Sequence, residues 1–149
     1  MFGSEDSLSQ EGQKIVAEWE QERKKIESNK ANLSGADLSF LKLMESDLSD
    51  ADLSEADLNS TYLIKANLRN ANLSNADLSS VVASDADFTG ANFEDAELMG
   101  AFLNGANLKD AKNLTCDQIE CAEFDRDTQF PSYICITWGE GKQCECKEQ

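Results

Sequence analysis

Residues 31–70 read ANLSG ADLSF LKLME SDLSD ADLSE ADLNS TYLIK ANLRN, one group of five after another. The same division continues through ANLSN ADLSS VVASD ADFTG ANFED AELMG AFLNG ANLKD, so sixteen groups fill residues 31–110 without an insertion or a deletion. A period of five matches neither the period of about 3.6 of an α-helix nor the period of about two of a β-strand. It predicts a solenoid, in which each unit buries its apolar face only by stacking on its neighbours.

Each group of five supplies one large and one small apolar residue. We call the central apolar position i; it is usually Leu, and position i−2 is Ala in twelve of the sixteen groups. The other three positions are mostly Asp, Asn, Ser, Glu or Gly. Short polar side chains suit tight corners because they bond to their own backbone. We therefore expect two inward and three outward residues per group.

Tandem A(D/N)LXX groups of this kind resemble the pentapeptide-repeat family, and the resemblance covers residues 31–110. It implies an all-β solenoid, a right-handed quadrilateral β-helix with four groups per coil. Four coils would result here, with residues 20 apart stacked directly on one another. The sequence supports that spacing, because three of the four exceptions to Ala at i−2 are Leu41, Thr61 and Val81. Where Val81 enlarges its site, the i residue shrinks to Ala83, as a packed core of fixed volume requires.

Two neighbouring sides of the predicted column differ at position i−1. The acidic ladder is the set Asp37, Asp57, Asp77 and Glu97. The next side has Lys42 and then the apolar strip, which we define as Tyr62, Val82 and Phe102 with Met44 and Ile64 at i+1. An acidic face can serve solubility alone, whereas a group of exposed apolar side chains usually marks a contact surface. We expect the strip to contact a second copy, a cap or tail of this chain, or another protein.

The two ends depart from the repeat, and the chain divides into residues 1–30, 31–112 and 113–149. The first part predicts an N-terminal helical cap, because Ser9 to Ser28 are rich in helix formers and lack Pro. Val16, Trp19 and Ile26 share one face of that helix, and we expect Trp19 to lie on the first coil.

The last part predicts a small C-terminal cap. Thr115 and Gln118 form a capping-box signature, so a short helix is expected from Cys116 to about Glu123, with Ile119 over the last coil. Residues 133–138 and 143–147 flank a Gly-rich turn and predict a β-hairpin. Pairing Trp138 with Gln143 would place Cys135 opposite Cys146.

All five cysteines lie in that C-terminal part: Cys116, Cys121, Cys135, Cys144 and Cys146. Disulfides help most where the core is smallest, so we expect at least one, joining Cys135 to Cys146 or Cys144. A disulfide implies an oxidising compartment, and the resemblance to lumenal members from cyanobacteria and chloroplasts favours the thylakoid lumen, with the periplasm as another such place. The alternatives are reduced thiols in the cytoplasm, or a zinc site, which the lack of His and of a CxxC pair disfavours.

The composition argues against catalysis and against several classes of ligand. The chain has no His, which excludes Ser–His and Cys–His arrangements, and its many Asp residues recur by register on flat faces. We therefore expect no enzyme, no cofactor and no bound metal, and a small-molecule ligand is disfavoured. A net charge of −16 disfavours binding to nucleic acid phosphates. No stretch approaches the roughly 20 apolar residues of a membrane span, and no signal or transit segment is evident.

These observations predict a non-catalytic scaffold that binds a protein partner or itself through one side of the β-helix. The resemblance also suggests an alternative, a DNA-mimicking topoisomerase ligand like the gyrase-binding members of the family. Those members resemble a longer dimeric rod, often with a loop that interrupts the repeat. This chain has neither that length nor such a loop.

Overall fold

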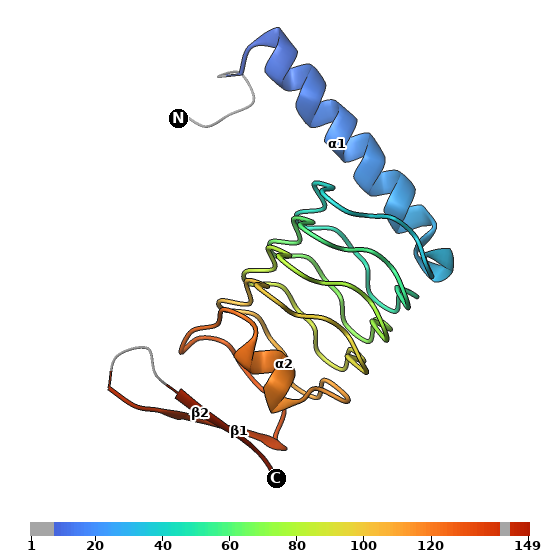
Figure 1. Cartoon of the computed structure of the whole chain (residues 1–149). Helices are drawn as coiled ribbons and strands as arrows, with labels where there is room; N and C mark the ends of the chain where they lie inside the picture. Colours follow the sequence, from blue (N-terminus) through green and yellow to red (C-terminus); the bar gives the residue numbers. More distant parts are fainter. Residues whose placement is uncertain (1–7, 141–143) are drawn as a thin grey trace.

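The chain folds into a repetitive column with a long helix at one end and a short helix and hairpin at the other (Figure 1). This computed structural model describes residues 8–140 and 144–149. The elements in chain order are α1 (Gln10–Ser28), a 3-10 turn (Lys30–Asn32), α2 (Cys116–Glu120), β1 (Ile134–Trp138) and β2 (Cys144–Glu148). None of the helices in the described ranges combines the length and apolar character needed to cross a membrane.

The column is held by parallel bridges between residues 20 apart, as the sequence predicts. Asp52 is bridged to Asn72, and Asn72 to Asn92. The Leu53 amide donates to the Asn72 carbonyl over 2.8 Å, and the Asn72 amide donates to the Ala51 carbonyl over 2.9 Å. Each bridge is isolated, so the sides of the column are much shorter than ordinary strands.

A tight corner ends every group of five. The Ala66 amide donates to the Leu63 carbonyl over 3.0 Å, and the third residue of that turn, Lys65, has a left-handed φ of 58°. At most groups the i−1 side chain also takes part: Asp52 Oδ1 accepts from the Ser54 amide, and Asn72 Oδ1 from the Ser74 amide. Asp and Asn recur at i−1 because their short side chains can satisfy this amide.

The core is the stack of i and i−2 side chains along the column. Leu73 is fully buried, and so are Leu53 and Phe93, which come 20 residues before and after it. Thr61 is also buried, and its hydroxyl donates to the Leu38 carbonyl over 2.7 Å, which compensates for burying a polar group. The predicted inward positions form this core except in the first coil, where Ala31 is exposed and Ala36 and Leu41 are half-buried.

Helix α1 meets the column only near its C-terminal end and diverges from it toward the N-terminus (Figure 1). Ser9 caps it, because the Ser9 Oγ accepts from the Gly12 amide over 3.1 Å. Ile26 is the α1 side chain that belongs to the core, and Trp19 is 40% exposed. Ile26, and not Trp19 as expected, thus joins the helix to the core, because the tilt of α1 carries its earlier turns away from the first coil.

Helix α2 ends at Glu120 rather than near Glu123. The following residues return to the column, because Glu123 is bridged to Phe102 and Gln129 to Asn107. The capping box is confirmed: Thr115 Oγ1 accepts from the Gln118 amide, and Gln118 Oε1 accepts from the Thr115 amide. Ile119 is fully buried, as expected.

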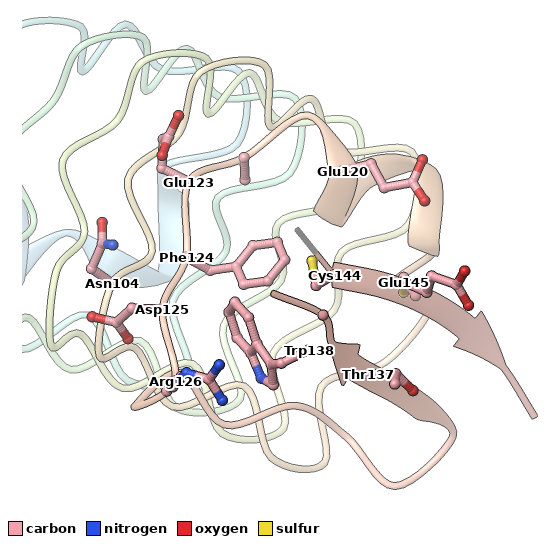
Figure 2. Close-up of a pocket in the computed structure, with 13 residues that line it drawn as sticks. Asn104, Glu120, Glu123, Phe124, Asp125, Arg126, Thr137, Trp138, Cys144 and Glu145 are labelled. Carbon is pink, nitrogen blue, oxygen red and sulfur yellow. The ribbon is translucent and has the colours of Figure 1, made fainter. Parts of the chain in front are cut away.

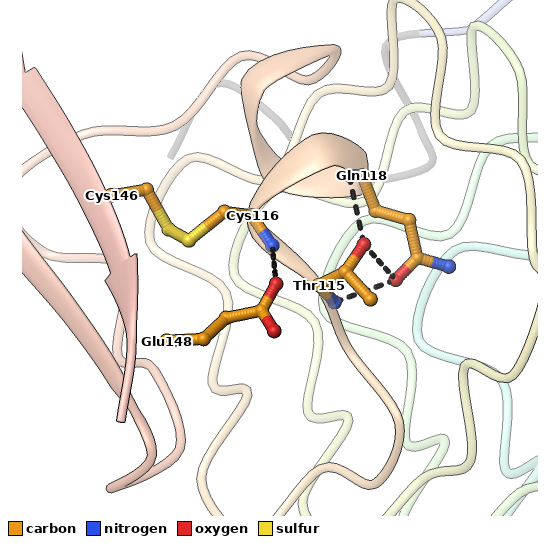
Figure 3. Close-up of a disulfide and its surroundings, with 5 residues drawn as sticks. All are labelled: Thr115, Cys116, Gln118, Cys146 and Glu148. Atoms are coloured by element: carbon orange, nitrogen blue, oxygen red, sulfur yellow. Dashed lines mark hydrogen bonds between the residues drawn. A yellow bond between two sulfur atoms is a disulfide. The ribbon is translucent and has the colours of Figure 1, made fainter.

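The hairpin has a register one residue away from the expected one. Trp138 is paired with Cys144 and Ile136 with Cys146, whereas Cys135 is opposite Lys147; the predicted partner Gln143 lies outside the described residues. A shift of one residue sends each side chain of a strand to the other face. The predicted pairing of Cys135 with Cys146 or Cys144 is therefore wrong, and the disulfide joins Cys116 to Cys146 with a Cα–Cα distance of 5.6 Å (Figure 3).

Candidate interaction surface

The apolar strip lies along one side of the column. Lys42, Tyr62, Val82 and Phe102 are joined by successive parallel bridges, so their side chains stack. Phe102 is 43% exposed, and the other four members of the strip are half-buried. The Lys42 ammonium lies 3.5 Å from the centre of the Tyr62 ring, a cation–π contact. Glu123 is bridged to Phe102 and takes the next place in this stack, so the returning chain continues the stack beyond the strip.

The strip lacks the turn hydrogen bond that the i−1 side chain makes on the other sides. Tyr62 and Val82 have no oxygen that could accept from the amides of Ile64 and Ser84. In the part of the chain that the structure describes, those two amides have no acceptor within the protein. The strip residues therefore give up a local contact that supports the fold elsewhere. The sequence carries this signal, because only one side lacks Asp and Asn at i−1 throughout.

The acidic ladder is stacked on the neighbouring side, with bridges from Asp37 through Asp57 and Asp77 to Glu97. Asp57 and Asp77 each accept from the amide two residues later, over 2.9 Å. The hydroxyl and the amide of Ser39 both donate to Asp37 and lower the pKa of that carboxyl. These three aspartates thus support their own corners as well as carrying charge.

Two further exposed apolar residues lie on the column outside the strip. Phe40 is 68% exposed at the corner between the ladder side and the strip side, and Met99 is 63% exposed two residues after Glu97. They occupy positions that Ser, Asn or Gly fill in the groups stacked with them. Comparing each outward position with those 20 residues away would have identified both.

A cleft opens at the C-terminal end of the strip, between residues 122–126 and the hairpin (Figure 2). Its volume is about 1070 Å³. The Phe124 and Trp138 rings meet edge to face inside it, with centroids 5.7 Å apart and an interplanar angle of 66°. The Arg126 guanidinium lies 4.9 Å from the centre of the Trp138 ring. Sequence reasoning missed this cleft because it exists only once the hairpin folds back onto the column.

The cleft is acidic. Glu120, Glu123, Asp125 and Glu145 line it, against the single cation Arg126 among the described lining residues. Loss of water raises the pKa of Asp125, but the amides of Gly105, Asp127 and Thr128 and the Thr128 hydroxyl donate to it, and the net pKa is lowered. Asp125 is therefore a charged group that the local turn already uses.

The disulfide fixes the wall of the cleft formed by the hairpin. Cys146 of β2 is bonded to Cys116 of α2, and the Cys116 amide donates to Glu148 Oε1 over 2.9 Å (Figure 3). The Tyr133 hydroxyl adds a link by donating to the Ala111 carbonyl over 2.7 Å. Cys121, Cys135 and Cys144 are free thiols, and Cys144 lines the cleft. Within the described residues no group of three or more His, Cys, Asp or Glu could hold a metal ion.

Several solved structures are similar to this chain. A pentapeptide repeat protein from Nostoc PCC 7120 is 31% identical over 78% of this chain and 85% of its own, with a TM-score of 0.39. A pentapeptide repeat protein from the thylakoid lumen of Arabidopsis thaliana is 24% identical over 72% of this chain and 68% of its own, with a TM-score of 0.42. QnrB1, a plasmid-mediated fluoroquinolone resistance protein, is 14% identical over 70% of this chain and 86% of its own, with a TM-score of 0.30.

A comparison with curated proteins finds no match. The family model for pentapeptide repeats matches residues 29–50, 51–90 and 71–112 with eight copies, which is more than half of the chain. Members of this family fold as right-handed quadrilateral β-helices and are generally non-catalytic, and the bridges between residues 20 apart agree with that fold. The chain belongs to the pentapeptide repeat family.

Proposed function

We propose that this protein is a non-catalytic scaffold that binds a protein partner, or a second copy of itself, through the apolar strip. The observation that carries the proposal is the stack from Tyr62 through Val82 to Phe102. Apolar side chains there replace the turn-supporting Asp and Asn of the other sides. Such a replacement gives up the turn hydrogen bond, and a contiguous apolar patch in water favours contact with another surface.

The acidic ladder beside the strip supports a partner with a basic rim. Its carboxylates repeat at every coil, and like charges at that spacing repel one another. A row of Lys or Arg on the partner would relieve this repulsion and would speed encounter in a salt-dependent way. The ladder would therefore govern the rate of association, and the strip would govern its strength.

The proposal includes how the chain is organised and where it works. Residues 31–112 would form four coils, with residues 1–30 and 113–149 closing the two ends. The disulfide between Cys116 and Cys146 supports an oxidising compartment, such as the thylakoid lumen or the periplasm. If protein isolated from its native compartment has five free thiols, the cytoplasm becomes the favoured location.

A DNA-mimicking gyrase ligand is the second candidate, and the acidic ladder is the feature that favours it. This candidate predicts inhibition of DNA supercoiling by gyrase, and loss of that inhibition when Asp57 and Asp77 are changed to Asn. The scaffold proposal predicts no such inhibition.

Charge placed on the strip tests the scaffold proposal. The variant Val82→Asp with Phe102→Asp should lose association, measured by sedimentation velocity for self-association and by quantitative capture for a partner. Its circular dichroism spectrum should be unchanged, because both side chains point outward. The matched control is Asn67→Asp with Asn107→Asp, which adds equal charge at i−1 on another side. Association that survives in the strip variant, or is lost equally in the control, would contradict the proposal.

A further inference from the structure

We propose that the cleft at the end of the apolar strip is a binding subsite for an arginine side chain of the protein partner. In the free protein, Arg126 of the chain itself occupies part of that subsite. This inference rests on the proposed function, since it names the chemistry of one partner residue. A small arginine analogue can test the subsite in the absence of the partner.

The aromatic wall is the first observation. A cation over an aromatic ring is attracted by the negative face of the π-system, and Trp gives the strongest attraction. Trp138 already holds such a cation, the Arg126 guanidinium at 4.9 Å. Arg126 is itself exposed, and among the described residues no carboxylate lies within ion-pair distance of it. Its hold on the ring is therefore weak enough for another guanidinium to displace it.

The acidic rim is the second observation. Asp125 Oδ1 accepts three hydrogen bonds from its own turn and one from the Gly105 amide of the coil before it. Glu145 Oε2 lies 3.9 Å from the Lys147 ammonium. Glu120 and Glu123 also line the cleft, are exposed, and have no cation partner within the described residues. Two carboxylates without a cation partner give the rim of the cleft a negative potential, which favours a cation over a neutral or an anionic group.

Continuity with the strip is the third observation. Glu123 is bridged to Phe102, so the rim of the cleft is the next step of the stack that forms the strip. Asn104, in the group that contains Phe102, lines the cleft as well. A partner segment lying along the strip would therefore deliver a residue at its end into the cleft. Arginine fits best, because its planar guanidinium stacks on rings and pairs with carboxylates at the same time.

Trp138 fluorescence provides the test. The chain has two tryptophans, so Trp19→Phe leaves Trp138 as the only indole. Titration with N-acetylarginine amide at constant ionic strength should change its emission saturably, whereas N-acetylglutamine amide should not. Adding Arg126→Gln should tighten the apparent affinity several-fold, because an internal competitor is removed. Adding Glu123→Gln should weaken it several-fold, and the charge-matched control Asp110→Asn should leave it unchanged.

Three results would overturn the inference: no saturable change with or without Arg126, an equal response to the neutral amide, or weaker binding after Arg126→Gln in a variant with an unchanged melting temperature. The strip variant Val82→Asp with Phe102→Asp separates this inference from the proposed function. It should still bind the arginine amide while failing to associate. If the titration fails but association still depends on the strip, the arginine subsite is rejected and the proposed function stands.

Discussion

The acidic ladder and the apolar strip occupy the same repeat position on neighbouring sides of one column. In the ladder, Asp57 and Asp77 accept hydrogen bonds from the amides of their own corners. In the strip, Tyr62 and Val82 stack through the same kind of bridge without making that bond. The fold is thus built by the inward residues and the corners, and it tolerates apolar residues at i−1. We propose that the composition of the strip reflects a surface outside the column that it contacts.

The largest effect should come from the core that both sides share. Leu73 is fully buried between Leu53 and Phe93, so Leu73→Ala should lower the free energy of unfolding by roughly 2–5 kcal/mol. Leu73→Asp should prevent folding. Urea denaturation followed by circular dichroism measures both, and a midpoint unchanged by either substitution would mean that the assigned register is wrong.

A smaller effect should separate the ladder from the strip. Asp77→Ala removes the acceptor for the Ser79 amide and should cost about 1 kcal/mol of unfolding free energy. Asp77→Asn keeps an acceptor and should cost less than half as much. Urea midpoints of the two variants measure the difference. Equal losses would show that charge, and not the turn hydrogen bond, is what Asp77 supplies to the fold.

Acid should lower the stability that the carboxylate-bearing sides contribute to the fold. The contribution of the strip should not change. Hydrogen bonds from Ser39 lower the pKa of Asp37. At Asp87, loss of water raises the pKa, but bonds from Thr89 and Arg69 outweigh it and the net pKa is lowered. Because these pKa values are lower in the folded state, the stability they contribute is complete above the unfolded value of about 3.9. It is lost as the pH falls through the folded values.

Denaturation midpoints between pH 5 and pH 3 test this acid effect. The loss of stability over that range should be smaller in Asp37→Asn with Asp87→Asn than in the wild type. Val82→Asn should follow the wild-type pH profile. A flattened profile in the strip variant would place the acid sensitivity elsewhere.

The smallest effect concerns the corners, which should be alike on both sides. Ser80 ends a group on the ladder side and Lys65 one on the strip side, with left-handed φ values of 57° and 58°. An L-residue in the left-handed conformation costs about 1–2 kcal/mol, which a Gly there avoids. Part of that stabilisation is offset because Gly loses more conformational entropy on folding. Ser80→Gly and Lys65→Gly should each stabilise by about 0.5 kcal/mol, measured by thermal melting. Unequal gains would mean that the two sides differ in more than i−1.

The register of the repeat could be predicted from the sequence because any other register is energetically unfavourable. A shift of one residue would bury polar side chains in every group and expose every Leu, so the pattern around Leu73 allows one register. The hairpin carries no such constraint. Cys135, Thr137, Glu145 and Lys147 are exposed where they lie, and neighbouring registers differ by few buried groups. The pairing of Trp138 with Cys144 depends instead on how the hairpin packs on the column.

Part of the candidate surface could be predicted from the sequence and part could not. Tyr62, Val82 and Phe102 could be placed on one side because their spacing equals one coil. The cleft could not be predicted, because Phe124 and Trp138 meet only through a return of the chain that no periodicity encodes. The tilt of α1 is also absent from the pattern: the spacing of Val16, Trp19 and Ile26 gives a face of the helix but not its angle to the column.

The most direct measurement compares stability and association in one variant, Val82→Asn with Phe102→Asn. This change gives the strip the residue type that the other sides use at i−1. We expect a urea midpoint equal to or above that of the wild type, because the amides of Ser84 and Asn104 gain an acceptor. We also expect association to be lost. A midpoint that falls would show that the strip serves the fold, and association that persists would show that the strip is not the contact surface.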